Sequence, residues 1–151
     1  MTSHPLHFLL ADDDRDDKEL FASVLSQIIP DAHIHMVSDG KDVVRYLENC
    51  APHELPTALI LDVNMPQMGG LAVLDWLKTN PRFLLQKNFV LSTSAEQWNR
   101  QVCLDRGVVE YFIKPNTVQG IWDIATKIAD YLLTLHGFPV KRKNNDPGKT
   151  S

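Results

Sequence analysis

Short apolar runs alternate along the chain with longer segments in which apolar residues recur every three or four positions. Most of the runs end at polar residues, which is typical of strands buried on both faces of a parallel sheet, while residues 33–37 alternate between polar and apolar side chains, which also indicates a strand. The segments between them have the spacing of amphipathic helices. The predicted strands are 7–11, 33–37, 57–61, 89–91 and 108–113, and the predicted helices are 16–29, 43–50, 71–77, 96–106 and 121–133.

Regular alternation of strands and helices predicts an α/β fold, with a parallel sheet covered by helices on both faces. A length of 151 residues and a hydrophobic content of 44% suit one domain with its own core. We assign this domain to residues 1–138. Residues 139–151 are rich in Lys, Arg and Asn and nearly free of apolar side chains, which predicts a disordered basic tail. No output domain is expected after residue 138, so output would come from binding another protein.

Charge and apolar content exclude several classes of partner. A net charge of −4 argues against direct nucleic-acid binding, because such domains are usually basic. No apolar run approaches the roughly 18 residues of a membrane span, and the N-terminus lacks the layout of a signal peptide. We therefore expect a cytoplasmic protein with no membrane partner. Cys50 and Cys103 lie in helical segments without a CxxC motif, so we interpret both as reduced thiols.

Polar residues follow four of the five predicted strands at the point where each strand ends. Asp12, Asp13 and Asp14 follow the first strand, and Asp62 follows the third. Ser92 and Thr93 follow the fourth, and Lys114 follows the fifth. Ligand sites in open parallel sheets lie beyond the carboxyl ends of the strands. These side chains are therefore expected to converge at one edge.

The chemistry of such a group favours phosphoryl transfer. Crowded carboxylates repel one another, and a hard divalent cation such as Mg²⁺ relieves that repulsion. Asp62 can then act as a nucleophile toward phosphorus. Lys114 adds a second positive charge, and the Ser92 hydroxyl can donate to a phosphoryl oxygen.

Four segments in order resemble the receiver domain of two-component response regulators. They are Leu9–Asp14, Leu59–Gly70, Val90–Ser94 and Tyr111–Pro115, and the resemblance extends over residues 6–136. The resemblance implies a protein of bacterial origin. It also implies a flavodoxin-like (βα)5 fold with five parallel strands in the order 2-1-3-4-5. It also implies phosphorelay signalling by a phosphoprotein rather than an enzyme acting on other substrates, although such a domain takes part in its own phosphorylation and dephosphorylation.

The resemblance assigns the phosphorylation chemistry to particular residues. Asp62 is implied to be the phospho-acceptor. Asp13 is implied to bind Mg²⁺ directly, and Asp12 to bind it directly or through water, while Asp62 and the backbone carbonyl of Asn64 complete the protein ligands.

The resemblance also implies a switch. Ser92 would move toward the phosphoryl group, and Tyr111 would turn inward when it does. Lys114 would pair with the phosphoryl group across a cis peptide to Pro115, since only a bond before proline makes the cis form accessible. Thr93 would replace Ser92 if the register shifted by one. The turn after the third strand is attributed to Gly69 and Gly70.

The implied partners are a histidine kinase, of the bacteriophytochrome type by analogy with free-standing receivers that share the early acidic run, or a phosphotransfer protein. Output would pass through the face formed by the fourth helix, fifth strand and fifth helix, either to another protein or to a second copy in a homodimer.

Two alternative functions, and one question about the role of nearby aspartates, remain open at this point. An aspartate-nucleophile phosphatase would want a second Asp two positions after Asp62, where this chain has Asn64. An unphosphorylated scaffold has no physical need for the charge cluster. Asp14, Asp16 and Asp17 are interpreted as capping and solvating the first helix rather than as ligands, because negative charge is favoured at a helix N-terminus.

Overall fold

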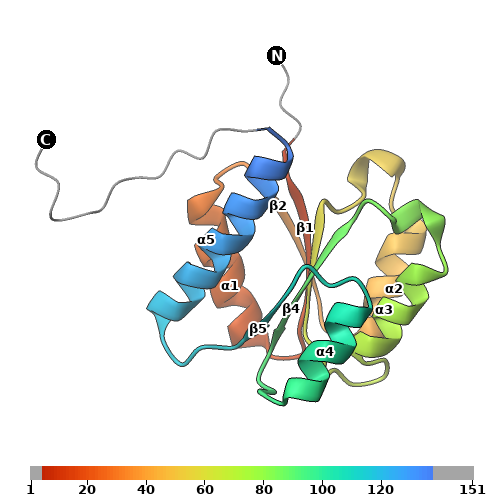
Figure 1. The fold of residues 1–151 in the computed structure, drawn as a ribbon. Coiled ribbons are helices and arrows are strands. Elements are labelled where there is room, and N and C mark those ends of the chain that lie inside the picture. Colours follow the sequence, from red (N-terminus) through yellow and green to blue (C-terminus); the bar gives the residue numbers. More distant parts are fainter. Residues whose placement is uncertain (1–4, 138–151) are drawn as a thin grey trace, which may run out of the picture.

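The computed structural model describes residues 5–137, without the side chains of residues 97 and 98; the tail predicted at 139–151 lies outside the described residues. Five strands alternate with five α-helices (Figure 1). The strands are β1 (His7–Ala11), β2 (His33–Val37), β3 (Ala58–Leu61), β4 (Lys87–Ser92) and β5 (Glu110–Ile113). The α-helices are α1 (Arg15–Ile28), α2 (Gly40–Asn49), α3 (Gly70–Lys78), α4 (Gln97–Asp105) and α5 (Val118–Leu135), and two 3-10 turns are Pro52–Glu54 and Pro81–Phe83.

The strands form one parallel sheet in the order β2-β1-β3-β4-β5. This confirms the doubly wound, flavodoxin-like fold. The chain reverses direction across the sheet between β1 and β3, because β2 lies on one side of β1 and all later strands lie on the other. The ends of β1 and β3 are therefore adjacent, which is where such folds bind ligands.

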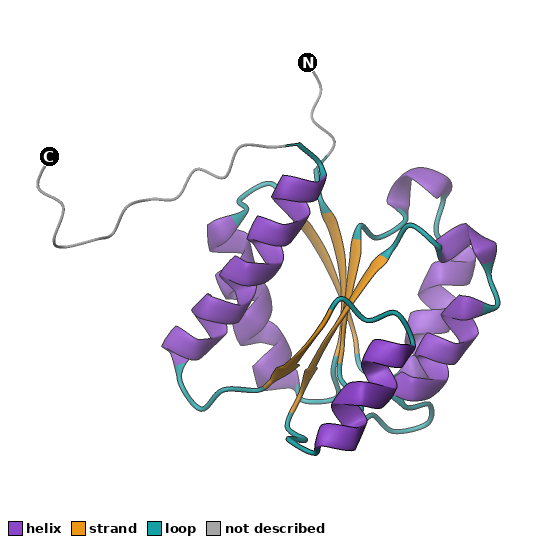
Figure 2. Cartoon of the chain, viewed as in Figure 1, coloured by secondary structure: helices purple, strands orange, loops and turns teal. Residues whose placement is uncertain are grey.

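Two helical layers cover the sheet (Figure 2). Helices α1 and α5 pack on one face around Phe8 and Leu10, and α2, α3 and α4 lie on the other face with Leu9 and Ala11. Side chains alternate between faces along a strand, so β1 supplies both cores. Cys50 and Cys103 are buried free thiols, as predicted.

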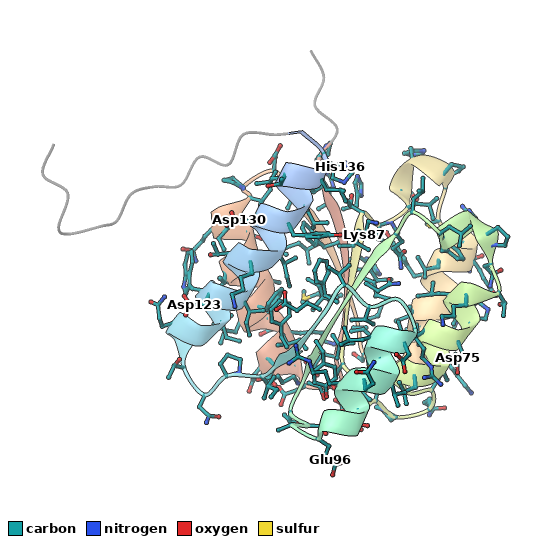
Figure 3. All side chains as sticks on the ribbon, in the orientation of Figure 1. Asp75, Lys87, Glu96, Asp123, Asp130 and His136 are labelled. Carbon is teal, nitrogen blue, oxygen red and sulfur yellow. The ribbon has the colours of Figure 1, made fainter. Side chains whose placement is uncertain are left out.

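Charged side chains lie on the outer surfaces of these layers. Figure 3 labels Asp123 and Asp130 on α5 and Asp75 on α3. Asp75 accepts a 2.8 Å hydrogen bond from Arg106, which follows α4. Because this ion pair is largely exposed, we expect it to contribute less than about 1 kcal/mol. None of the helices described is long and apolar enough to span a membrane.

Local hydrogen bonds move some element boundaries from their predicted positions. Helix α1 begins at Arg15 because the Asp14 side chain accepts from the N–H of Asp17 at 3.0 Å. Strand β5 begins at Glu110 rather than at 108, since the N–H of Val108 still bonds to the end of α4. Gly107 follows the end of α4 with a φ of 83°, in the left-handed region that favours glycine after a helix.

Candidate phosphoryl-transfer and metal site

Three buried polar side chains lie together at the carboxyl edge of the sheet. They are Asp12, Asp62 and Ser92, and Lys18 is the fourth buried polar or charged residue among those described. Asp13 and Thr93 are exposed. Burying polar groups is unfavourable unless they are paired, so their concentration at one edge indicates a site rather than a chance arrangement.

Backbone hydrogen bonds continue the sheet by one residue beyond the strands and fix these side chains. The N–H of Asp12 donates to the Val37 carbonyl at 3.2 Å, and that of Asp62 donates to the Ala11 carbonyl at 2.9 Å. The N–H of Lys114 donates to the Ser92 carbonyl at 2.8 Å. The site residues are therefore set by the sheet register.

Asp12, Asp13 and Asp62 form an acidic cluster in which one carboxylate oxygen of each lies within 4.8 Å of the others. The Oδ1 atoms of the two buried members are already engaged by loop N–H groups. Asp12 accepts from Asp14 at 2.9 Å, and Asp62 accepts from Asn64 at 3.1 Å. Three carboxylates from two adjacent strand ends are the oxygen donors that Mg²⁺ prefers, so the residues fit this ion.

Lys114 supplies the positive charge of the site. Its Nζ lies 2.7 Å from Asp12 Oδ2, 3.0 Å from Asp17 Oδ2 and 3.3 Å from Asp62 Oδ2. Burial lowers the pKa of this ammonium, but its hydrogen bonds to Asp12 and Asp17 and the charge of Asp62 outweigh burial, so its pKa is raised. Lys114 therefore stays charged at neutral pH.

Burial has the larger effect on Asp12. It raises the pKa of this carboxyl from 3.8 to about 6, although the hydrogen bonds from Lys114 and from the N–H of Asp14 act in the opposite direction. The nearby charge of Asp62 is a smaller cause of the same rise in pKa. One ammonium thus compensates the buried carboxylates only in part.

Asp17 is the site residue that the sequence analysis missed. Asp14 does cap α1, and Asp16 is exposed, in line with the capping interpretation. Asp17 instead reaches Lys114, which is 97 residues away in the chain. Helix α1 packs on the same face of the sheet as α5, and the Lys114 side chain after β5 reaches its first turn; no spacing in the sequence encodes that packing directly.

The expectation of a cis peptide between Lys114 and Pro115 was wrong, because the described residues contain no cis peptide bond. The trans form is intrinsically favoured by about 0.5–1 kcal/mol before proline. The Lys114 amine reaches all three carboxylates with the peptide in the trans form, so the observed contacts do not require the cis isomer.

Ser92 and Tyr111 are linked through Ser94. The N–H of Ser94 donates to Ser92 Oγ at 3.3 Å, and the Tyr111 hydroxyl donates to the Ser94 carbonyl at 2.7 Å. The Tyr111 ring is buried in this structure. The switch roles of these residues stay predictions, but a hydrogen-bonded connection between them is present.

The loop between β3 and α3 uses its glycines for close approach. A Cβ atom on Gly70 would lie 2.6 Å from the carbonyl oxygen of Asp62 and 2.8 Å from Val63 Cα. The positive φ of this turn falls on Gln67, at 69°, and not on the glycines. Gly70 thus lets α3 begin directly against the backbone of the predicted phospho-acceptor.

A doubly wound parallel sheet that presents an acidic cluster and a lysine at its carboxyl edge places the chain among α/β proteins with a ligand site at that edge. The model of the response regulator receiver domain matches residues 8–126. The chain belongs to the response regulator receiver domain family.

Several relatives agree with this assignment. Response regulator Rcp1 of Synechocystis sp. is 25% identical over 132 residues, which are 85% of this chain and 90% of Rcp1. The Mn²⁺-bound structure of Rcp1 has a TM-score of 0.77 and covers 89% of this chain and 99% of that one. The phosphorylated cyanobacterial phytochrome response regulator RcpA, at 24% identity, covers 87% and 96% with a TM-score of 0.78, which supports the fold.

Other relatives are longer. Transcriptional regulatory protein GltR of Pseudomonas aeruginosa is 29% identical over 115 residues, and the matched region is 76% of this chain but 45% of GltR. This chain therefore corresponds to less than half of GltR.

Proposed function

We propose that this receiver domain is a phosphorylation switch in which Asp62 takes a phosphoryl group from a histidine kinase or a phosphotransfer protein, with Mg²⁺ as cofactor. The observation that carries the proposal is the contact of Lys114 with both Asp12 and Asp62, beside the cluster of Asp12, Asp13 and Asp62. This arrangement provides a nucleophile, metal ligands and a fixed cation within one small volume.

Each residue of the site has a defined task in this proposal. A carboxylate oxygen of Asp62 forms the new bond to phosphorus while the bond from phosphorus to the donor breaks and its electron pair leaves with the donor. Asp12, Asp13, Asp62 and the carbonyl of Asn64 would hold Mg²⁺, which neutralises negative charge when bound. The Lys114 ammonium would donate to a phosphoryl oxygen with the N–H that now faces Asp62.

The signal would leave the site through Ser92. Its Oγ is hydrogen-bonded to Ser94, whose carbonyl accepts from Tyr111 on β5. A movement of Ser92 toward the phosphoryl group would therefore alter the support of Tyr111. Beyond it, Ile113 and Val118 are exposed apolar residues at the end of β5 and the start of α5. We assign the α4–β5–α5 face as the surface for a partner protein or for a second copy (Figure 1).

The kind of kinase is inferred from the relatives. RcpA is described as a phytochrome response regulator, and RPA3017, at 23% identity with a TM-score of 0.70, as a response regulator in red light signalling of R. palustris. A bacteriophytochrome-type kinase is the first candidate donor. Rcp1 has a Mn²⁺-bound form, which supports the proposal that the acidic cluster of this chain takes a divalent cation.

The test is intact-protein mass spectrometry after incubation with acetyl phosphate, with and without Mg²⁺. The variants are Asp62→Asn and, as a matched control that removes the same charge from a residue on α5 that is not part of the site, Asp123→Asn (Figure 3). We expect one Mg²⁺-dependent phosphoryl adduct in the wild type and the control, and none in Asp62→Asn. No adduct in the wild type would refute the proposal. Continuous release of phosphate from phosphoesters would instead indicate a phosphatase.

A further inference from the structure

The ammonium group of Lys114 has three carboxylate partners, and one of them, Asp17, lies outside the acidic cluster. An ammonium has three N–H donors, so the contacts to Asp12, Asp17 and Asp62 use all of its donors. Two of the three partners belong to the proposed metal and phosphoryl chemistry. Asp17 is the partner that this chemistry does not engage.

This difference between Asp17 and the other two partners matters when Mg²⁺ and a phosphodonor bind at the site. The inference therefore rests on the proposed function. Asp12 would be one of the residues that hold Mg²⁺, and an oxygen of Asp62 would carry the phosphoryl group. Lys114 would then lose its partners at 2.7 and 3.3 Å, while the contact to Asp17 at 3.0 Å could persist. Lysine has a long, flexible side chain, so a persistent partner limits where its charge can lie.

Asp17 is well placed to be such a partner, because its backbone is fixed. Its N–H donates to Asp14 Oδ1 at 3.0 Å, and the N–H of Asp14 donates to Asp12 Oδ1 at 2.9 Å. The next residue, Lys18, is buried and donates to the Val37 carbonyl at 3.2 Å and to Ser38 Oγ at 2.8 Å. The first turn of α1 is thus attached to the end of β2 on one side and to Lys114, after β5, on the other.

We propose that Asp17 is a positioning residue for phosphoryl transfer, which holds the ammonium group of Lys114 beside Asp62 while Mg²⁺ and the phosphodonor occupy the site. Asp17 makes no contact with the reacting atoms in this role and acts through Lys114. The Asp17 side chain is 45% exposed and that of Lys114 is 10% exposed. A half-exposed ion pair of this kind corresponds to a rate effect of about fivefold.

A general charge effect would have the opposite sign. Removing any carboxylate near the site reduces the repulsion of an anionic donor and should speed phosphorylation. Asp16 provides the matched control, because it is exposed, lies in the same first turn and gains the same stabilisation from the helix dipole. It differs from Asp17 in that the structure gives it no contact with Lys114.

The experiment measures the phosphorylation rate with acetyl phosphate at saturating Mg²⁺ and donor. Wild type is compared with Asp17→Asn, Asp17→Glu, Asp16→Asn, Lys114→Met and the double variant Asp17→Asn/Lys114→Met. We expect Asp17→Asn to be about fivefold slower, Asp17→Glu to recover most of the rate, and Asp16→Asn to stay within about twofold of wild type or slightly faster. In the Lys114→Met background, Asp17→Asn should have no further effect.

The second readout is the NMR signal of the Lys114 ammonium, assigned from its loss in Lys114→Met. With Mg²⁺ present to engage Asp12, we expect this signal to broaden in Asp17→Asn and to be retained in Asp16→Asn, because only the first substitution removes one of the carboxylate partners that remain to the amine. This readout requires no phosphorylation, so it decides the role of Asp17 even if Lys114→Met forms no adduct.

Two results would overturn the inference while the proposed function stood. One is a wild-type rate in Asp17→Asn with an unchanged Lys114 signal. The other is an equal slowing by Asp17→Asn with and without Lys114. If the wild type accepts no phosphoryl group, the proposed function fails instead, and an unchanged ammonium signal in Asp17→Asn would then also exclude Asp17 as the residue that positions Lys114.

Discussion

The buried carboxylate of Asp12 should destabilise the metal-free fold at neutral pH, and Asp12→Asn should therefore be more stable than the wild type. Asp12 is 4% exposed, and its pKa rises from 3.8 to about 6 on folding. Asparagine keeps the shape of the protonated acid without its charge. The substitution thus removes the unfavourable ionisation and leaves most of the packing intact.

The size of the effect follows from the shift in pKa. A rise from 3.8 to about 6 corresponds to about 3 kcal/mol at pH 7.5, taking about 1.4 kcal/mol for each pKa unit. Between those two values the folded protein binds more protons than the unfolded chain, so the free energy of unfolding falls as pH rises through this window. The penalty is complete above pH 6 and absent below about pH 3.8.

Urea unfolding at pH 7.5 and pH 4.5 provides the assay. We expect Asp12→Asn to be more stable by about 1–3 kcal/mol at pH 7.5, and the difference to shrink by about 2 kcal/mol at pH 4.5. Burial lowers the pKa of His7, so the folded state binds fewer protons there and loses stability as pH falls. Both proteins share that term, and it cancels in their difference.

Addition of Mg²⁺ extends the test. Binding to the folded state should raise the stability of the wild type, and the gain should be smaller in Asp12→Asn because one ligand is missing. A variant that is less stable than the wild type at pH 7.5 would refute the reasoning. It would mean that the 2.7 Å contact with Lys114 stabilises Asp12 more than burial destabilises it.

Two further substitutions test the loops around the site. Gly70→Ala should destabilise the fold by about 2 kcal/mol in urea unfolding, because its Cβ would lie 2.6 Å from the Asp62 carbonyl oxygen. Gly69→Ala is the control, because its Cβ would meet only the Val63 carbonyl oxygen, at 3.3 Å, which is tight but a smaller overlap than at Gly70; equal effects of the two would contradict the close-approach argument. Tyr111→Phe should lose about 1 kcal/mol with the hydrogen bond to Ser94, yet accept phosphoryl groups at nearly the wild-type rate. A large loss of phosphorylation would place the Tyr111 hydroxyl in the transfer chemistry itself.

The centre of the sheet was predictable because β1, β3 and most of β4 are buried on both faces. A run such as 58–61 is apolar without interruption and ends at Asp62, so both the strand and its end are visible in the sequence. Strand β5 was less visible, since Val108 continues the apolar pattern while its N–H still belongs to the end of α4. The pattern of apolar residues does not predict the end of a strand or helix when a single hydrogen bond decides it.

The convergence of Asp12, Asp62 and Lys114 was predictable for a topological reason. Parallel strands end at the same edge of a sheet, so polar residues that follow them must lie near one another. Asp17 lies in helix α1 and does not follow a strand, so the topology of the sheet does not predict its position. Its contact depends on how α1 lies across the sheet, and residues in a first helical turn have an equally good explanation as capping residues.

The charges of the site link its stability to its function. Asp12, Asp17 and Asp62 contact a single ammonium, and Asp13 lies in the acidic cluster beside them. Burial, with a smaller contribution from the charge of Asp62, raises the pKa of Asp12 in spite of that ammonium. Under the proposed function, an added divalent cation relieves the repulsion that remains in the metal-free state. The same unfavourable energy that lowers the stability of the metal-free fold therefore contributes to metal affinity. A substitution that removes one of the clustered carboxylates should raise the stability of the metal-free fold and lower the affinity for the metal. A variant that raised both the stability and the affinity would show that the two are not connected through these charges.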